Sequence, residues 1–335
     1  MISPKQSPPR GGDCFVATNA PRNDGETRLN IRALDLLDLP TLSRHRNDAL
    51  ILDSTRALTR GNPLGAAGFL SHFNPARHVY TAIAKNNGDS LLGSVIHTPS
   101  ETFARLLYLA PSTHLTHPSL VPLIENLSTQ AGTWGAFQVI ADVEETSEAF
   151  ASLRNAGFAV YAWQRMWNLS SITEADARSG WKRMREMDIP SIQSLHYQIV
   201  PPLLQPVEPL PRRAEGFICN EGSKCHVGVS SGMAGIVLSP MIHPEAKDVG
   251  AKLCGLMLDL RGRGSRPLYV RVRSYQAWIE PVLEDLGALA GPRQAVMVKH
   301  LTRLIKDEEA LKAVQPAGVS VQPSRVSHIE AKKES

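Results

Sequence analysis

The sequence lacks the features that mark several classes of protein. It has no apolar run long enough to cross a membrane, and its first residues lack the apolar segment of a secretory signal peptide. Its net charge is only +4 over 335 residues, and no stretch of lysine and arginine is dense enough for a nucleic-acid patch. We therefore expect a cytoplasmic protein with no nucleic-acid partner and no membrane partner.

Cysteine is also scarce, and the arrangement of the four cysteines favours no metal site. Cys14 lies in a polar, proline-rich stretch, while Cys219 and Cys225 flank a short segment and could face each other across a hairpin. No second cysteine pair completes a zinc set. His114 and His117 are three positions apart, but no third ligand accompanies them. We expect ordinary thiols and no bound metal.

What the chain does contain is an internal repeat. The segment 38–42 returns with like residue types as the segment 188–192. A second pattern of leucine, glycine, glutamine and methionine also occurs twice in the same order, as Leu153, Gly157, Gln164 and Met166, and as Leu283, Gly287, Gln294 and Met297. A duplicated domain explains this order better than chance, and the length of the chain favours two domains.

The composition divides the chain into two copies with polar segments around them. Few large apolar residues occur in the tails, so these cannot bury enough surface to offset the entropy of ordering. The predicted division is a disordered tail at 1–27, a first domain at 28–170, a linker at 171–180, a second domain at 181–306, and a disordered tail at 307–335.

Both copies show the same predicted order of elements: an antiparallel meander, then β-α-β-α-β. In the first copy, alternation predicts strands at 29–33, 79–84, 90–97, 104–110, 137–143 and 159–168, with helices beginning at 39 and spanning 120–131 and 147–156. In the second copy it predicts a helix after 188, a hairpin at 217–229, strands at 234–239, 268–273 and 294–300, and helices at 246–261 and 276–286. The predicted fold class is α/β, of the α+β type.

Local signals place the ends of these helices. Asp38 precedes Leu39 and Pro40, so its side-chain oxygen is predicted to cap the helix that follows. Gly157 and Gly287 are predicted to end the two late helices. Asn87-Gly88 is the strongest hairpin signal in the chain.

These residues resemble the GNAT (N-acetyltransferase) superfamily. The late helix with Ala149, Phe150 and Leu153 that ends at Gly157-Phe158 is similar to a family signature. The opening from Ile31-Arg32 to Asp38 also resembles the start of a GNAT domain; the second copy resembles the family through 188–190, 238–240 and 283–287. The resemblance implies two GNAT-like domains, each a mixed, mostly antiparallel sheet flanked by helices. It also implies N-acetyl transfer from acetyl-CoA to an amine, either a small molecule or a protein N-terminus or lysine.

In that family a glycine-rich loop at a helix N-terminus holds the pyrophosphate of acetyl-CoA through bare backbone amides. The corresponding positions of the first copy are His114, His117 and Ser119, so that loop is degenerate. In the second copy they are Glu245, Asp248 and Gly250, where one glycine survives but two carboxylates face the place of a polyanion. The residues expected to bind acetyl-CoA are Lys247, Val249, Gly250, Ala251 and Lys252, through loop amides and two ammonium groups.

No catalytic residue is assigned from the sequence. Many enzymes of the family place a tyrosine in the late helix, where this chain has Leu153 and Leu283. Tyr108 or Tyr275 could substitute, although a single tyrosine is more often a packing residue. The alternative function is a non-catalytic GNAT-fold module that binds a small molecule or a partner protein. The first copy could also be structural and complete a groove of the second. Oligomeric state stays undecided.

Overall fold

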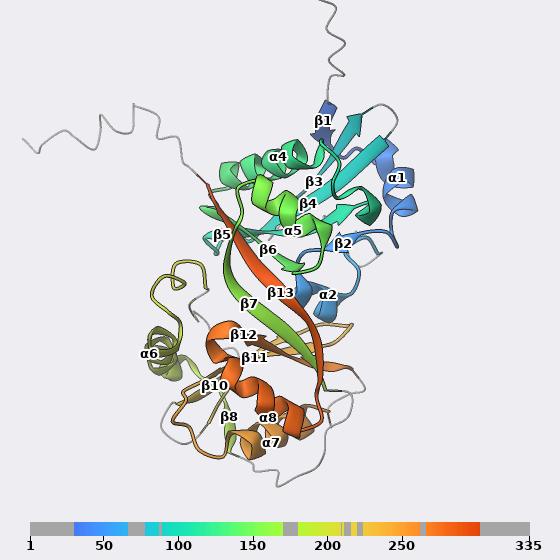
Figure 1. The fold of residues 1–335 in the computed structure, drawn as a ribbon. Coiled ribbons are helices and arrows are strands. Elements are labelled where there is room, and N and C mark those ends of the chain that lie inside the picture. Colours follow the sequence, from blue (N-terminus) through green and yellow to red (C-terminus); the bar gives the residue numbers. More distant parts are fainter. Residues whose placement is uncertain are drawn as a thin grey trace, which may run out of the picture.

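The computed structural model describes residues 30–65, 78–86, 89–169, 180–208, 210, 216–219, 224–261 and 266–301 (Figure 1). Both predicted tails, nearly all of the predicted linker, and the turn residues Asn87 and Gly88 lie outside the described residues. The strands on either side of that turn do pair, with Asn86 opposite Asp89, as the hairpin signal predicts.

All described strands belong to one sheet of thirteen strands. Their order across the sheet is β1-β3-β4-β5-β6-β13-β7-β12-β11-β10-β9-β8, and β2 pairs with β5 off this path. The strands of the first copy are β1 (Asn30–Ala33), β2 (Leu50–Ile51), β3 (His78–Asn86), β4 (Asp89–His97), β5 (Phe103–Ala110), β6 (Gln138–Glu144) and β7 (Ala159–Asn168). The strands of the second copy are β8 (Trp181–Arg183), β9 (Phe217–Cys219), β10 (Cys225–Ser231), β11 (Ile236–Ile242), β12 (Leu268–Arg273) and β13 (Leu289–His300).

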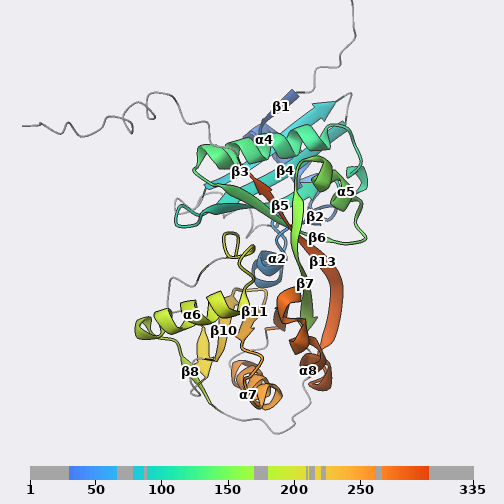
Figure 2. The same ribbon diagram turned by 60° about the vertical axis from the view of Figure 1, so that its left-hand side comes forward.

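Helices cover both faces of this sheet (Figures 1 and 2). The α-helices of the described chain are α1 (Leu39–Arg44), α2 (Ser54–Arg60), α4 (Leu120–Thr133), α5 (Glu148–Asn155), α6 (Ile189–Ile199), α7 (Val249–Arg261) and α8 (Glu280–Asp285). The 3-10 helices are η1 (Leu36–Asp38), η3 (Ser112–His114), η4 (Glu186–Asp188) and η5 (Ser274–Ile279). Where one helix is predicted over 276–286, the chain forms η5 and then α8. Gln276, inside η5, takes non-helical dihedral angles, so regular helix begins only after it.

The predicted fold class is confirmed, since the chain forms a mixed and mostly antiparallel sheet with helices on both faces. Each copy contributes one parallel strand pair, β5 with β6 in the first copy and β11 with β12 in the second. The helix that connects each parallel pair, α4 or α7, packs over a large apolar core. The order of elements therefore repeats along the chain, as the sequence repeat predicts.

The last strands of the two copies lie side by side at the centre of the sheet (Figure 1). β13, from the second copy, lies between β6 and β7 of the first copy, and β7 pairs in turn with β12 of the second. The repeat residues Gln164 and Gln294 face each other in this pairing, and Gln164 Nε2 donates to Gln294 Oε1 at 3.0 Å. Each copy thus completes the sheet of the other, and the two glutamines mark the centre of the pseudo-twofold arrangement.

The repeated aspartates have a different role from the predicted one. Asp38 precedes α1 but makes no side-chain capping bond. Its carboxylate instead accepts two hydrogen bonds from Arg32, at 2.6 and 2.8 Å, and one from the backbone N–H of Asp35 at 3.1 Å. In the second copy, Asp188 accepts from the N–H of Arg185 at 2.9 Å and lies 3.6 Å from Lys182. The repeat therefore preserves a carboxylate that ties the first strand to the start of the first helix.

The repeated glycines end helices as predicted, and both do so in the left-handed conformation, with φ +82°. After α5, the N–H of Phe158 donates to the carbonyl of Leu153; after α8, the N–H of Ala288 donates to the carbonyl of Leu283. This is the Schellman pattern, in which glycine avoids the steric cost of positive φ. Leu153 and Leu283 are themselves fully buried.

The Asp38 contact predicts a pH-dependent contribution to stability. The hydrogen bonds from Arg32 lower the pKa of Asp38 to about 2, so the stabilisation is present above the pKa of the unfolded state and is lost as pH falls through the folded value. Asp38→Asn should lower the melting temperature at pH 7 by roughly 2–4 °C, and the difference from the wild type should shrink steadily as pH falls from about 4 through 2. Thermal unfolding followed by circular dichroism measures both. Asp285→Asn, on the exposed end of α8, is the control; a difference from the wild type that is as large at pH 2 as at pH 7 would contradict the assignment.

The exchanged strands predict that the second copy cannot fold alone. In a fragment of residues 176–335, β13 loses both of its partners and β12 loses β7, although Ala295, Val296 and Met297 of β13 are fully buried in the whole chain. We expect an aggregated or unfolded fragment, observed by size exclusion and far-UV circular dichroism. Addition of residues 1–175 during refolding should restore a folded complex. A monomeric fragment with a cooperative unfolding transition would refute this prediction.

Candidate functional site

The predicted acetyl-CoA residues lie where the second copy begins α7. Val249, Gly250 and Ala251 form its first turn, whose N–H groups have no acceptor four residues earlier within the helix. Asp248, just before it, takes a left-handed φ of +53°. Lys247 is exposed next to this turn. The terminus therefore presents backbone donors and one ammonium group to an anion.

Lys252 differs from its predicted role. The residue is only 6% exposed, and its Nζ donates to the backbone carbonyl of Lys247 at 2.8 Å. Its own carbonyl accepts a hydrogen bond from Trp181 Nε1 at 2.7 Å. The ammonium group is thus folded back onto the loop, where it holds the loop in shape.

Glu245, one of the two carboxylates predicted to repel a bound polyanion, is paired with a cation. Glu245 Oε2 lies 3.0 Å from Lys224 Nζ, and this hydrogen bond lowers the pKa of Glu245. Lys224, rather than Lys247 or Lys252, offsets that charge. A Cβ at Gly250 would lie 3.4 Å from Val282 Cγ1 of α8, which is an ordinary contact, so packing does not require glycine there.

Beside this loop, the parallel strands of the second copy part from one another. β11 and β12 pair only from Ile236 opposite Leu268 to Leu238 opposite Val270, although both strands continue. The sequence places the end of β11 at Pro240, but the strand runs on to Ile242. The N–H of Ile236 points toward the β12 side, so the nitrogen of Pro240 points that way too. Proline is tolerated there because β12 has already turned away and no ladder bond is lost.

The loop with the predicted binding residues begins where the unpaired part of β11 ends, because residues 243–248 connect β11 to α7. At its far end the side chain of Gln276 donates to the carbonyl of Ile242 at 3.2 Å. The described part of the segment 200–210 makes no backbone hydrogen bond to β11 or β12. Its Val207 and Glu208 N–H groups donate instead to the carbonyl of Leu204, within the same segment. The second copy therefore keeps an unpaired strand edge beside a helix N-terminus.

The first copy has the same parting of strands, but its own chain fills the gap. β5 and β6 pair only from Phe103 to Arg105. Beyond that point β2 pairs with β5, and the N–H of Leu52 donates to the carbonyl of Leu107 at 2.9 Å. The carbonyl of Leu52 accepts from the N–H of Asp142, on β6, at 2.8 Å. Leu52 is 1% exposed, so it bridges both strands inside the protein.

The other predicted features of the first copy are also structural. His117 Nδ1 accepts from the N–H of Ser119 at 3.1 Å, and the rings of His114 and His117 lie 6.4 Å apart. Within the described residues no group of histidine, cysteine, aspartate and glutamate could hold a metal ion. Tyr108 is 1% exposed in the core, where burial raises its pKa to about 12. It packs rather than serving a site.

A cluster that the sequence analysis missed lies on the sheet face opposite α7. Arg273 Nε and Glu208 Oε1 form an ion pair at 2.9 Å, without hydrogen-bond geometry, between side chains that are each 6% exposed. Arg273 also donates to Gln164 Oε1 at 2.7 Å. Tyr275 lies within electrostatic range of both charges, and its pKa is raised, first by burial and then by Glu208. Alternation along β12 could have revealed this face, because buried Leu268, Val270 and Val272 leave Tyr269, Arg271 and Arg273 on the other side.

His196, on α6, belongs to the surroundings of this cluster. It is 2% exposed, and neither ring nitrogen has a hydrogen-bond partner. Burial lowers its pKa, and the nearby charge of Glu208 opposes the shift. The ring is therefore neutral at pH 7.

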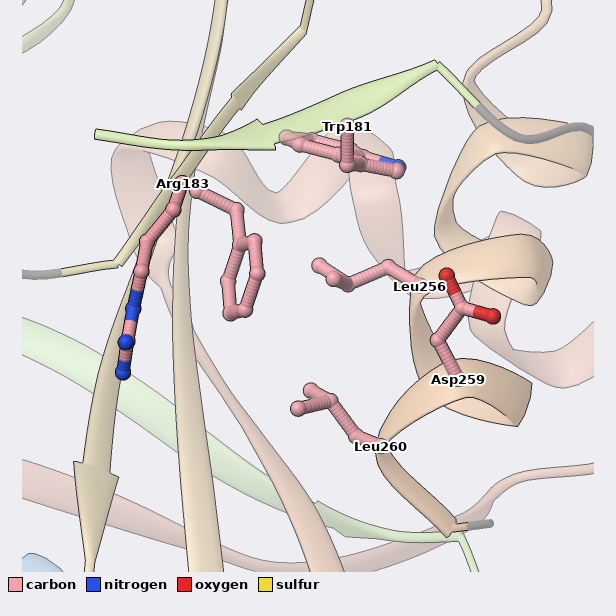
Figure 3. Close-up of a pocket in the computed structure, with 6 residues that line it drawn as sticks. Trp181, Arg183, Leu256, Asp259 and Leu260 are labelled. Atoms are coloured by element: carbon pink, nitrogen blue, oxygen red, sulfur yellow. The ribbon is translucent and has the colours of Figure 1, made fainter. Parts of the chain in front are cut away.

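A small cavity of about 230 Å³ lies elsewhere, between α7 and the edge strands (Figure 3). Leu256 and Leu260 of α7 point into it, below Trp181 of β8. Arg183 and Asp259 stand on opposite sides of it. It lies along the body of α7, and none of the residues 247–252 lines it.

Three solved structures are similar to this chain. A GCN5-related N-acetyltransferase from Sphaerobacter thermophilus is 12% identical over 83% of this chain and 97% of its own, with a TM-score of 0.50. A tandem GNAT protein from the clavulanic acid biosynthesis pathway is 13% identical over 83% of this chain and 100% of its own, with a TM-score of 0.47. A GNAT-family acetyltransferase from Colwellia psychrerythraea is 14% identical over 81% and 100%, with a TM-score of 0.44.

No protein-family model and no curated protein sequence matches the chain. The Sphaerobacter match nevertheless covers most of this chain and nearly all of its own, so the GNAT resemblance seen in the sequence is confirmed at the level of fold. At 12% identity the likeness concerns the fold alone. In the part of the chain that the structure describes, no helix combines the length and apolarity that a membrane span requires.

Because Leu52 fills the gap of the first copy, the stability of the protein should depend strongly on this residue. Leu52→Ala should lower the free energy of unfolding by about 2–5 kcal/mol, because it leaves a cavity in the apolar core where the bridging residue is anchored. Urea denaturation measures the change. Leu37→Ala makes the same chemical change at a residue that is 87% exposed, and it should cost far less. Equal effects of the two substitutions would show that the side chain of Leu52 does not anchor this segment in the core.

Proposed function

We propose that this protein transfers an acetyl group from acetyl-CoA to an amine and that the second copy holds the active cleft. The observation that carries the proposal is the contrast between the copies. β11 and β12 part beside the N-terminus of α7 and leave an unpaired edge, whereas the equivalent gap of the first copy is bridged by Leu52.

The residues of the second copy fit the thioester co-substrate. The first-turn amides of Val249, Gly250 and Ala251 would bind pyrophosphate oxygens, and Lys247 would add a positive charge. The unpaired edge of β11 offers backbone groups to an extended, amide-containing arm. When bound, acetyl-CoA supplies an activated acetyl group that a neutral amine can attack.

The chain's own contribution is positioning and exclusion of water. An amine would reach the cleft from the face opposite α7, where α6 and α2 pack on β11 and Glu208 of the loop at 200–208 pairs with Arg273 of β12 (Figure 2). α2 belongs to the first copy but packs on β10 and β11 of the second, and Ala234 donates to the carbonyl of Thr59 at 2.9 Å. The first copy would thus complete the acceptor side of the cleft, which explains why a closed copy is retained.

A second candidate function is a non-catalytic GNAT-fold module that binds a small molecule or a partner protein. The specific observation in its favour is that Leu153 and Leu283, at the positions where family enzymes place a tyrosine, are fully buried core residues. Turnover of acetyl-CoA with any amine would exclude this alternative, while binding without turnover would favour it.

Calorimetric titration of acetyl-CoA tests whether the protein binds this co-substrate, and also whether only the second copy binds it. We expect one binding site per chain, because the first cleft is filled. Lys247→Glu should weaken binding by about tenfold or more, since it replaces an attraction to the phosphates with a repulsion. Arg44→Glu, an equal charge change on exposed α1, should leave the affinity unchanged.

Absence of heat at millimolar acetyl-CoA would reject the proposed function. Two sites per chain would reject the closure of the first copy. Unchanged affinity in Lys247→Glu would show that the ligand binds elsewhere.

A further inference from the structure

The face of β12 that points away from α7 carries two arginines, and a third lies on β5. Val270 and Val272 are buried toward α7, so Arg271 and Arg273 point to the opposite face. Arg105 of β5 is close enough to interact electrostatically with Arg271. Burial of three guanidinium groups is costly unless each is offset by negative charge.

Two of the three arginines have such compensation. Arg273 pairs with Glu208 at 2.9 Å and donates to Gln164, and all three residues are less than 9% exposed. Burial alone would lower the pKa of Arg105, but Asp53 and then Asp142 outweigh it and raise that pKa.

Arg271 lacks an equivalent partner. Its one hydrogen bond to a side chain is a long contact of 3.4 Å from NH1 to the hydroxyl of Thr55. Its Nε is buried and has no hydrogen-bond partner. Burial first, and then the charge of Arg273, lower the pKa of Arg271. The charges of Glu208 and Asp142 oppose this shift, but neither carboxylate makes a hydrogen bond or ion pair with Arg271.

The position of Arg271 relates it to the cleft. Val270 is the last residue of β12 that pairs with β11, and Arg271 follows it at the point where the strands part. Its side chain lies on the face from which an acceptor amine would approach. Arg271 is half-buried, whereas Arg273 is buried, so part of Arg271 meets solvent.

We propose that Arg271 binds a carboxylate group of the acceptor, so that the acceptor is an amine that also carries a carboxylate. This inference rests on the proposed acetyl transfer. The guanidinium of Arg271 has no carboxylate bonded to it, and its planar donors match the two oxygens of a carboxylate. The neighbouring carboxylates of Glu208 and Asp142 disfavour a doubly charged phosphate.

Two substitutions separate binding from packing in the protein without ligand. Arg271→Gln removes a cation that lacks a partner, so it should leave the melting temperature unchanged or raise it. Arg273→Gln removes the partner of buried Glu208 and should lower the melting temperature by several degrees. An equal fall for Arg271→Gln would overturn the inference, because Arg271 would then be a structural residue.

Propionate serves as the carboxylate probe for the whole chain, with sodium chloride and sodium phosphate at the same ionic strength as comparisons. In the wild type, propionate at about five times its dissociation constant should raise the melting temperature by roughly 2–4 °C. Arg271→Gln should abolish this rise, while its affinity for acetyl-CoA should stay within twofold of the wild type. A rise that survives the substitution, or an equal rise with phosphate, would overturn the assignment.

The outcomes distinguish this inference from the proposed function. A wild type that binds acetyl-CoA but shows no response to propionate contradicts the carboxylate site alone. A response that depends on Arg271 in a protein that does not bind acetyl-CoA supports an anion site and contradicts acetyl transfer.

Discussion

The central constraint on this structure is the pairing of β7 with β13, the last strand of each copy. Each strand completes the sheet of the other copy, and their register sets Gln164 against Gln294 at the pseudo-twofold centre. Ser54 of α2 also donates to Gln294, and Arg273 donates to Gln164. The junction of the copies is therefore continuous with the polar cluster beside the second cleft, so changes in strand pairing would also move the proposed site.

This arrangement lets the two copies diverge in chemistry while they keep the same fold. In both copies the parallel strands part after a short pairing, and a helix follows the first of them. In the first copy β2 occupies the gap and satisfies backbone groups of both strands through Leu52. In the second copy the corresponding segment carries Glu208 to Arg273, and the gap between the strands stays unpaired. A filled cleft adds core and stability, whereas an unpaired edge retains the capacity to bind.

Much of the fold could be predicted from single residues whose effects are local. Gly157 and Gly287 end helices because they adopt positive φ at little cost, and alternation in β12 identifies its buried face. The duplicated order predicts two like sets of elements. The prediction that Asp38 caps α1 was wrong. Once β1 and η1 are folded, Arg32 lies within reach and is a stronger, charged partner for the carboxylate. The strand predicted at 234–239 runs on through Pro240 to Ile242, because β12 has already parted from that side of β11, which the sequence does not show.

The candidate site depended on tertiary structure to a greater degree. Helix propensity and spacing place Lys247 to Lys252 at the start of α7, but the inward turn of Lys252 follows from contacts with the folded loop. In the sequence, Leu52 likewise has no feature that distinguishes it from other core leucines. Only long-range pairing places it between β5 and β6. Local sequence thus decides which segments become strands and helices, since dihedral preferences and side-chain alternation act over a few residues. Which gap is closed, and which arginine is left without a bonded carboxylate, depends on residues far apart in the chain that meet only after folding.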